Sequence, residues 1–244
     1  MKHRVVYTVI SGNYDKLTEV KNESGIDYYI VSDSEINIPS GWKLLVISDS
    51  GYTGHLFNRY YKINPHLLFQ EYDESLYIDG NITIISDINS LFDYALLDNE
   101  IALYNHPERK CVYDEAEVLK TVGYDYFYKI NEQMKGYKRE GFKSDALYEG
   151  NIIFRKHNTL PMTNVAASWF KELTTKVSRD QLSLTYCCFK ESVSITSLGR
   201  HDARFVNTYF EYRPHNHRNS AMKYTVRFIN IIARLSKFDK GIHE

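Results

Sequence analysis

The tripeptide Asp79-Gly80-Asn81 stands between two apolar runs of the sequence, SLYI and ITII. A carboxylate at the end of a strand can hold a divalent cation that bridges two phosphates, because Mg²⁺ and Mn²⁺ prefer hard oxygen ligands. Gly80 would allow the backbone to approach such a ligand closely. The alternative is a tight turn between two strands, for which Asp-Gly is typical. Taken alone, the tripeptide favours the turn.

Two basic residues just before this stretch change that weighting. Arg59 and Lys62 are three residues apart in a segment with apolar residues at helical spacing, so they share one helix face. An arginine fork and a lysine point charge near a carboxylate are suited to contact a diphosphate. The alternative for both residues is an ordinary solvated helix face.

The composition of the chain limits the classes of protein. With 244 residues, of which 43% are hydrophobic, the chain can bury a full core and is expected to form one enzyme-sized domain. The 30 basic and 31 acidic residues nearly cancel, which argues against a nucleic-acid binder. The three cysteines form neither a CxxC pair nor an even framework, which favours a reduced, cytosolic setting. No apolar run approaches the ~20 residues needed to span a bilayer.

Strand-like and helical patterns alternate along the sequence, and this order predicts an α/β fold with a mostly parallel central sheet flanked by helices. Strands are expected at 4–10, 27–33, 43–48, 75–79, 81–85 and 100–105, with a strand pair at 146–158. Helices are expected at 54–72 with a second start at Pro65, and at 86–97, 113–140, 163–177 and 179–190. Ligands of such sheets gather at the carboxyl ends of the strands. The polar tips at 11–15, Asp33 and Asp79 should therefore converge.

The order of these parts resembles GT-A glycosyltransferases such as the family-8 retaining enzymes, in which an arginine-bearing helix leads to a strand and a DxD-type motif. A closer resemblance is to a plant and bacterial family once listed as a domain of unknown function and now treated as glycosyltransferase-like, typified by plant mucilage-related and turgor-regulation proteins. The matching segments cover roughly residues 5–185 and include YTVISGNYD, RYYKINPH, YIDGNI, NHPERKCVYDEA, EGNIIFRKHN and RDQLS.

The resemblance implies a GT-A-like fold and a nucleotide-sugar donor, most simply a UDP-sugar, with a surface polysaccharide or lipid-linked glycan as acceptor. It implies catalytic roles for Asp79, Glu149, Asp180 and Gln181. It implies donor binding by Tyr7, Gly12, Asp33, Arg59, Lys62 and Asn151. Simpler roles stay open: core packing for Tyr7, a solvent-facing strand position for Glu149, and a helix cap for Asp180. A metal-dependent hydrolase, as discussed for one plant relative proposed as a ceramidase, and a non-catalytic nucleotide or sugar binder are the alternative functions.

The expected cofactor is Mn²⁺ or Mg²⁺, with Asp79, Asn81, His215 and His217 as its ligands. Family-8 enzymes have a metal-binding histidine late in the chain, and His215 and His217 share one side of an extended segment. The third position of the DxD-type motif is the neutral Asn81, so further ligands must complete the metal shell. A zinc site is the competing idea, but no clean ligand spacing supports it.

The C-terminal residues 221–244 are expected to follow the domain at 1–220 as a basic amphipathic helix and tail. Such helices can lie on anionic membranes, which suits a lipid-linked acceptor, and residues 222–238 are the expected contact. The protein would then be cytoplasmic and peripheral to the inner face of the membrane. The alternative is that the helix packs its apolar face on its own domain.

Overall fold

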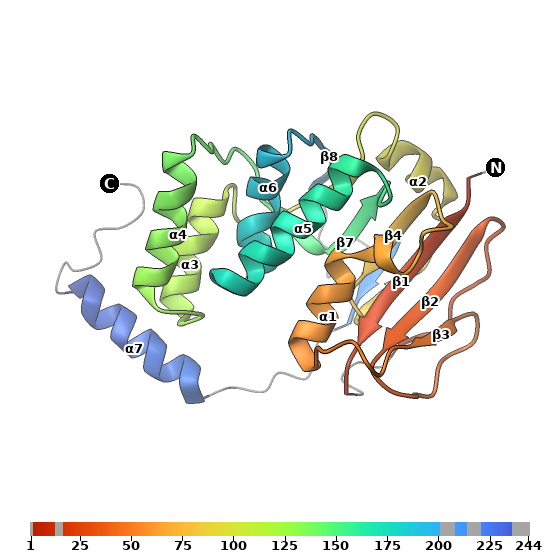
Figure 1. Cartoon of the computed structure of the whole chain (residues 1–244), viewed down its shortest axis with the longest axis horizontal. Coiled ribbons are helices and arrows are strands. Elements are labelled where there is room, and N and C mark those ends of the chain that lie inside the picture. Colours follow the sequence, from red (N-terminus) through yellow and green to blue (C-terminus); the bar gives the residue numbers. More distant parts are fainter. Residues whose placement is uncertain (1, 13–16, 201–207, 214–220, 236–244) are drawn as a thin grey trace.

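The computed structural model of the chain describes residues 2–12, 17–200, 208–213 and 221–235. A seven-stranded sheet with the order β3-β2-β1-β4-β7-β6-β8 forms the centre of the molecule (Figure 1). Strand β7 is antiparallel to β4 and β6, and the other pairs are parallel. The strands are β1 (Arg4–Ile10), β2 (Ile26–Ser32), β3 (Lys43–Val46), β4 (Glu74–Ile78), β6 (Ile101–Asn105), β7 (Tyr148–Arg155) and β8 (Ile195–Arg200). The predicted α/β fold with a mostly parallel sheet is confirmed.

The central strand β1 shows why the sheet forms here. All seven of its residues, RVVYTVI, are buried, and five of them are the large apolar residues that a strand covered on both faces needs. Val5, Tyr7 and Val9 point into one core and Val6 and Ile10 into the other, as strand alternation demands. The sheet therefore separates two apolar layers.

Helices cover both faces of the sheet. One core is formed with α1 (Gly54–Ile63), α3 (Val112–Val122), α4 (Phe127–Arg139), α5 (Leu160–Thr175) and α6 (Asp180–Lys190). The other core is formed with α2 (Asn89–Ala95) and a small sheet of β5 (Ile82–Ile84) and β9 (Phe210–Tyr212). The last helix, α7 (Ala221–Leu235), lies beside α3 at the end of the molecule away from β3 (Figure 1).

Three local predictions need correction. The predicted strand pair at 146–158 is one strand, β7, because Gly150 and Asn151 stay extended instead of forming a turn. The predicted helical region 113–140 is two helices, because Gly123 adopts a left-handed φ of 70° that ends α3. The predicted helix at 54–72 ends at Ile63, and Pro65 begins a short 3₁₀ turn (Pro65–Leu67). The strands β8 and β9 were not predicted.

Candidate active site

Three polar strand ends meet at one edge of the sheet. β1 lies between β2 and β4, and all three strands are parallel, so Ser11, Asp33 and Asp79 follow them on the same side. The Ser11 hydroxyl donates to the Asp33 carboxylate, and Gly12 beside them has a left-handed φ of 68°. The predicted convergence is confirmed for Ser11, Asp33 and Asp79, whereas residues 13–15 of the predicted tip lie outside the described residues.

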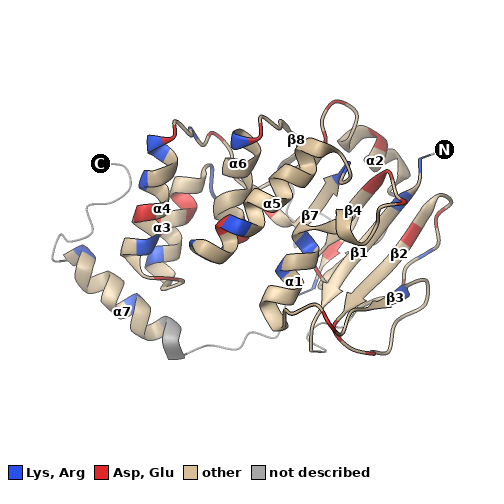
Figure 2. Cartoon of the chain, viewed as in Figure 1, with Lys and Arg blue, Asp and Glu red and all other residues tan. Residues whose placement is uncertain are grey.

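Next to Asp79, two basic residues of α1 meet the first residue of α6. Lys62 Nζ lies 2.7 Å from Asp180 Oδ2 and 3.7 Å from Asp79 Oδ1. Arg59 Nε lies 3.5 Å from the same Asp180 oxygen. The basic positions of α1 are seen in Figure 2. Four of the predicted site residues, from three elements far apart in sequence, thus form one charge cluster: Arg59, Lys62, Asp79 and Asp180.

The four side chains of the charge cluster differ in burial, and this determines which of them a ligand in solution can reach. The side chains of Lys62 and Asp180 are 2% and 5% exposed, whereas those of Arg59 and Asp79 are 19% and 29% exposed. A ligand in solution can therefore reach Arg59 and Asp79, while Lys62 and Asp180 lie behind them. The predicted direct contact of Lys62 with a diphosphate is not supported by this placement.

Electrostatics fix the charges of the buried pair. Burial alone would raise the pKa of Asp180, but Arg59, Lys62 and Arg179 outweigh it and hold that pKa well below its usual range. Burial lowers the pKa of Lys62, and Asp180 and Asp79 oppose this effect. At 2.7 Å from an ionised carboxylate, the Lys62 ammonium is the protonation state that the geometry supports. The pKa of Arg59 is raised because the same two carboxylates overcome its burial.

Tyr77 and Gly150 complete the surroundings of Lys62. The Tyr77 hydroxyl donates to Asp79 Oδ1 over 2.7 Å, and Lys62 Nζ lies 5.0 Å from the centre of the Tyr77 ring. A Cβ atom at Gly150 would stand 3.4 Å from both Asp180 Oδ2 and Lys62 Nζ. Because glycine has no side chain, position 150 places no Cβ atom against the Lys62–Asp180 ion pair.

The start of α6 holds Asp180 in place from behind. Asp180 Oδ1 accepts from the Gln181 backbone N–H at 3.1 Å, and the Asp180 carbonyl accepts from Trp169 Nε1 at 3.0 Å. Gln181 Nε2 donates to the Tyr148 carbonyl at 3.3 Å, which links α6 to β7. Asp180 is the first residue of α6, and the N-cap is Arg179, which has no side-chain cap hydrogen bond, so the helix-cap alternative for Asp180 is wrong.

Three other predicted residues, Tyr7 and Asn151 for donor binding and Glu149 for catalysis, lie outside the charge cluster. Tyr7 is fully buried, and its hydroxyl donates to the Lys62 carbonyl at 2.8 Å, so this placement favours core packing over contact with a base. The Asn151 carbonyl accepts from the Asp79 N–H at 2.8 Å. Glu149 is half-buried on β7, next to Gly150.

The described part of the chain does not provide a complete metal site. Asn81 Nδ2 donates to the Arg213 carbonyl at 2.9 Å, so the side chain ties the turn to β9. In the described residues no group of three His, Cys, Asp or Glu side chains is placed to hold a metal ion. Asp79 is the one predicted carboxylate ligand among them, and Lys62 lies against it. The predicted ligands His215 and His217 lie outside the described residues.

Sequence reasoning missed a second row of charges behind Asp180. The Glu115 carboxylate of α3 is 1% exposed and pairs with both Arg109 and Arg179, the latter at 3.1 Å. Arg179 directly precedes Asp180 and contributes to its low pKa. The sequence marks Arg179 only as the first letter of RDQ, and Glu115 as one of several acids in DEAE.

Arg109 also lines a pocket of about 450 Å³ beside this row of charges. The loop 105–110 forms one side, and the segment 145–147 and Arg200 form the rest. The His106 backbone N–H donates to the Leu147 carbonyl at 2.8 Å and fixes the loop to the start of β7. The NHPERK motif therefore lines one side of a polar pocket, and the ion pairs of Glu115 with Arg109 and Arg179 link that side to the start of α6.

Several solved glycosyltransferases are similar to the chain. The bifunctional glycosyltransferase WbbM has 14% identity and a TM-score of 0.48, over 81% of this chain and 39% of that one. The galactosyltransferase LgtC has 10% identity and a TM-score of 0.48, over 94% and 95%. Mouse xyloside xylosyltransferase 1 has 10% identity and a TM-score of 0.43, over 81% and 84%. The chain thus spans about two fifths of the length of WbbM.

No curated protein matches the sequence. The model of one protein family, described as the TOD1/MUCI70 glycosyltransferase-like domain, matches residues 14–199, which is most of the chain. The match includes the charge cluster, the DGN turn, the NHPERK loop and the start of α6. The chain belongs to the TOD1/MUCI70 glycosyltransferase-like domain family.

Proposed function

We propose that the protein transfers a sugar from a nucleotide-sugar donor, most simply a UDP-sugar, to a glycan or lipid-linked glycan acceptor. The observation that carries this proposal is the charge cluster at the carboxyl edge of the sheet, where Arg59 and Asp79 are accessible and Lys62 and Asp180 are buried behind them. This edge is where α/β sheets bind nucleotides. Membership of a glycosyltransferase-like family supports the same activity.

In this proposal the accessible residues contact the donor. The bond between the sugar carbon and the β-phosphate oxygen breaks, and the diphosphate leaves with the electron pair of that bond and additional negative charge. The acceptor hydroxyl oxygen bonds to the sugar carbon and releases its proton to the solvent. The Arg59 guanidinium stabilises that charge, and Asp79 accepts hydrogen bonds from donor hydroxyls. Lys62 and Asp180 are positioning residues, because they hold Arg59 and Asp79 without reaching the ligand.

The charge balance of the cluster supports an additional cation. Two basic and two acidic side chains cancel, so a bound diphosphate would add negative charge that the four residues do not neutralise. This is the reason to retain the prediction of Mn²⁺ or Mg²⁺, although the described residues alone do not form its site. The metal dependence of donor binding is therefore a part of the test.

We place the acceptor at the pocket formed by the NHPERK loop. Its volume of about 450 Å³ can hold a sugar unit, and its lining includes Arg109, Lys110 and Asp145. The charge row from Arg109 through Glu115 to Arg179 leads from this pocket to Asp180. An acceptor bound there would lie on the side of the charge cluster toward α6 and β7.

A thermal-shift screen of nucleotide sugars, with and without Mn²⁺, tests the donor site. A UDP-sugar should raise the melting temperature, and more so with Mn²⁺, because ligands that bind the folded state stabilise it. For Arg59→Gln, about ten times more ligand should be needed to produce the same shift in melting temperature, because one charge-assisted contact is lost. Arg139→Gln, on an exposed position of α4, is the matched control.

A turnover assay with the donors that stabilise the protein, together with the thermal-shift screen, separates a transferase from a non-catalytic binder. Release of free sugar from the stabilising donor supports a transferase, since many such enzymes transfer slowly to water. Binding without any turnover over an acceptor panel would indicate a non-catalytic binder. If no nucleotide sugar or nucleoside diphosphate shifts the melting temperature at millimolar concentration, the proposed donor site is wrong.

A further inference from the structure

Helix α7 is attached to the domain by a polar residue. Asn230 is 4% exposed, and its Nδ2 donates to the carbonyls of Lys120 and Asp125, each at 3.0 Å. Its Oδ1 accepts from the Phe127 N–H at 2.9 Å. Val226 and Ala233, one turn away on either side, are also buried. The face of α7 that docks on α3 and α4 is therefore short and centred on an asparagine.

The larger side chains of α7 point the other way. Tyr224, Phe228, Ile231 and Leu235 are 59%, 65%, 42% and 79% exposed. They follow one another at spacings of four, three and four residues, which places them on a single helix face. This stripe is offset by two residues from Val226 and Asn230, which is roughly 200° around the helix. Tyr224, Phe228 and Leu235 thus face away from the domain, contrary to the alternative that the apolar stripe packs on it, whereas Ile231 lies at the edge of the stripe and lines a small pocket with α3.

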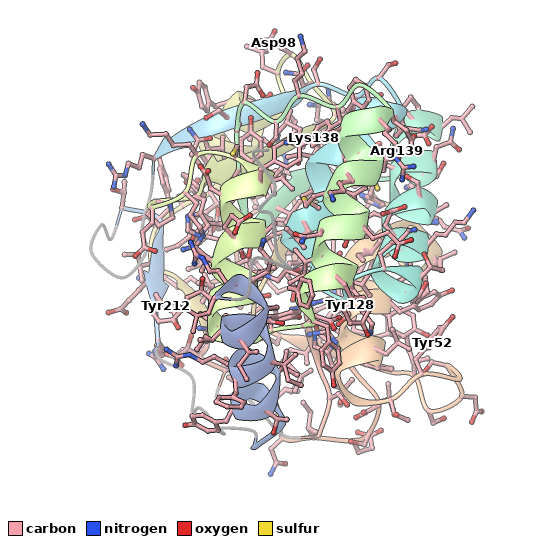
Figure 3. The ribbon with its side chains drawn as sticks, turned by 90° about the vertical axis from the view of Figure 1, so that its left-hand side faces the viewer. Tyr52, Asp98, Tyr128, Lys138, Arg139 and Tyr212 are labelled. Atoms are coloured by element: carbon pink, nitrogen blue, oxygen red, sulfur yellow. The ribbon has the colours of Figure 1, made fainter. Side chains whose placement is uncertain are left out.

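Figures 2 and 3 show where α7 lies and which of its positions are charged. α7 lies on the outside of the helical layer, toward the viewer in Figure 3, with the labelled Tyr128 of α4 next to it. It carries basic and no acidic positions in Figure 2. Arg227 and Arg234 form no ion pair within the described part of the chain. An exposed apolar stripe is therefore flanked by two arginines that form no ion pair with the described acidic residues, although Arg234 lines a small pocket with Glu117 of α3.

The charge of the whole segment is strongly positive. Between Glu211 and Asp239 the sequence contains six Lys or Arg residues and no Asp or Glu, although the complete chain has a net charge of −1. None of the helices in the described residues is long and apolar enough to cross a bilayer. Apolar residues on one face, basic residues beside them and insufficient length to span are typical of helices that lie in a membrane surface.

We propose that α7 binds the surface of an anionic membrane, with Tyr224, Phe228, Ile231 and Leu235 inserted between the lipids and Arg227 and Arg234 against the phosphate groups. The positive charge of the α7 segment is complementary to anionic lipid headgroups, and this favours a membrane over a second copy of this chain as the partner. In a symmetric dimer the same basic segments would face each other and repel. The proposal does not depend on glycosyl transfer, because its test measures membrane binding alone.

Sedimentation of the full chain with vesicles tests this proposal. The wild type should bind vesicles of phosphatidylcholine with about one third phosphatidylglycerol, and bind pure phosphatidylcholine vesicles much more weakly. Phe228→Ser/Leu235→Ser should lower the partition coefficient about tenfold or more, since two large apolar groups leave the membrane. Arg227→Gln/Arg234→Gln should lower it about thirtyfold, roughly fivefold for each charge near the surface.

The matched control is Tyr94→Ser/Leu97→Ser, because these α2-region residues are equally exposed, at 62% and 72%, and lie far from α7 in Figure 1. This control should bind vesicles like the wild type, and all variants should keep the wild-type melting temperature. The proposal is overturned if the wild type does not bind anionic vesicles, or if Phe228→Ser/Leu235→Ser binds as the wild type does. It is also overturned if that variant only converts a dimer into a monomer, which would assign the stripe to a second copy.

Discussion

Replacement of Lys62 by methionine is the most informative perturbation of the charge cluster. Lysine and methionine side chains have similar lengths, so Lys62→Met removes the positive charge without creating a large cavity. Asp180, 5% exposed, would lose its hydrogen bond of 2.7 Å and keep Arg59 at 3.5 Å. Breaking a buried pair by removing one partner costs about 3–5 kcal/mol, and the remaining Arg59 places the expectation near the lower end, at about 3 kcal/mol.

Urea unfolding at neutral pH measures this loss. The control is Lys43→Met, which breaks an equally short pair with Asp27 at 2.8 Å whose side chains are 56% and 40% exposed. A surface pair of this kind contributes less than about 1 kcal/mol. In Lys62→Met/Asp180→Asn the buried charge is gone as well, and the double variant should recover at least about 1 kcal/mol.

The difference in unfolding free energy between Lys62→Met and Lys43→Met tests whether the buried ion pair organises the site. If Lys62→Met costs no more than Lys43→Met, the buried ion pair does not organise the site, and the assignment of Lys62 as a positioning residue fails. The dependence of stability on pH in the acid range provides a second test. Because the pKa of Asp180 is depressed on folding, its stabilisation is complete above the unfolded value near 4 and is lost as pH falls toward the folded value. Lys62→Met should therefore reduce the dependence of stability on pH in this acid range.

Three further changes have defined outcomes. Burial lowers the pKa of His157 to about 4, below its unfolded value near 6.5. The folded protein therefore keeps its full stability above about pH 6.5 and loses up to about 3 kcal/mol as the pH falls to about 4, because the unfolded chain binds the proton more readily. In urea unfolding, His157→Gln should show a weaker dependence of stability on pH over this range. Gly150→Ala should change the free energy of unfolding by less than about 1 kcal/mol, because its Cβ would lie at ordinary contact distance from Asp180 and Lys62, and it should leave donor binding in a titration unchanged, because this buried ion pair does not reach the donor. Asn81→Asp should bind Mn²⁺ more tightly but unfold about 1–3 kcal/mol more easily, because its carboxylate would face a backbone carbonyl that the amide now donates to.

Much of the fold follows from local sequence patterns. β1 and β4 are uniformly buried strands, and their runs RVVYTVI and ESLYI contain the apolar and β-branched residues that such strands need. The edge strand β8, ITSLGR, alternates irregularly and is largely exposed, so its sequence has no comparable signal. β9 has three residues and pairs with β5, 126 or more positions earlier in the chain, so only the tertiary structure defines it.

The four residues of the charge cluster could be selected from the sequence, but their burial and their contacts with one another could not. The spacing of Arg59 and Lys62 shows that they share a helix face, and the strand end marks Asp79. The sequence does not show that α6 brings Asp180 against this face, since that contact joins residues 118 positions apart. It follows that Lys62, predicted to be an accessible phosphate ligand, could be recognised as a buried partner of Asp180 only from the structure.

The orientation of α7 shows the same limit. Periodicity identifies an amphipathic helix, but not which side faces the domain. The structure docks the helix through Asn230, whose amide satisfies three backbone groups at the ends of α3 and α4. A helix terminus leaves such groups without partners, and this need outweighs the apolar stripe in deciding which face is buried.

The central claim is that the charge cluster at the sheet edge binds and activates a nucleotide-sugar donor. Its most direct test is the release of nucleoside diphosphate and free sugar from a panel of nucleotide sugars with Mn²⁺, measured for the wild type, Asp79→Asn and Arg139→Gln. We predict turnover of at least one donor by the wild type and by Arg139→Gln, and a decrease of about a hundredfold or more in Asp79→Asn. Equal turnover in Asp79→Asn and the wild type would contradict the account.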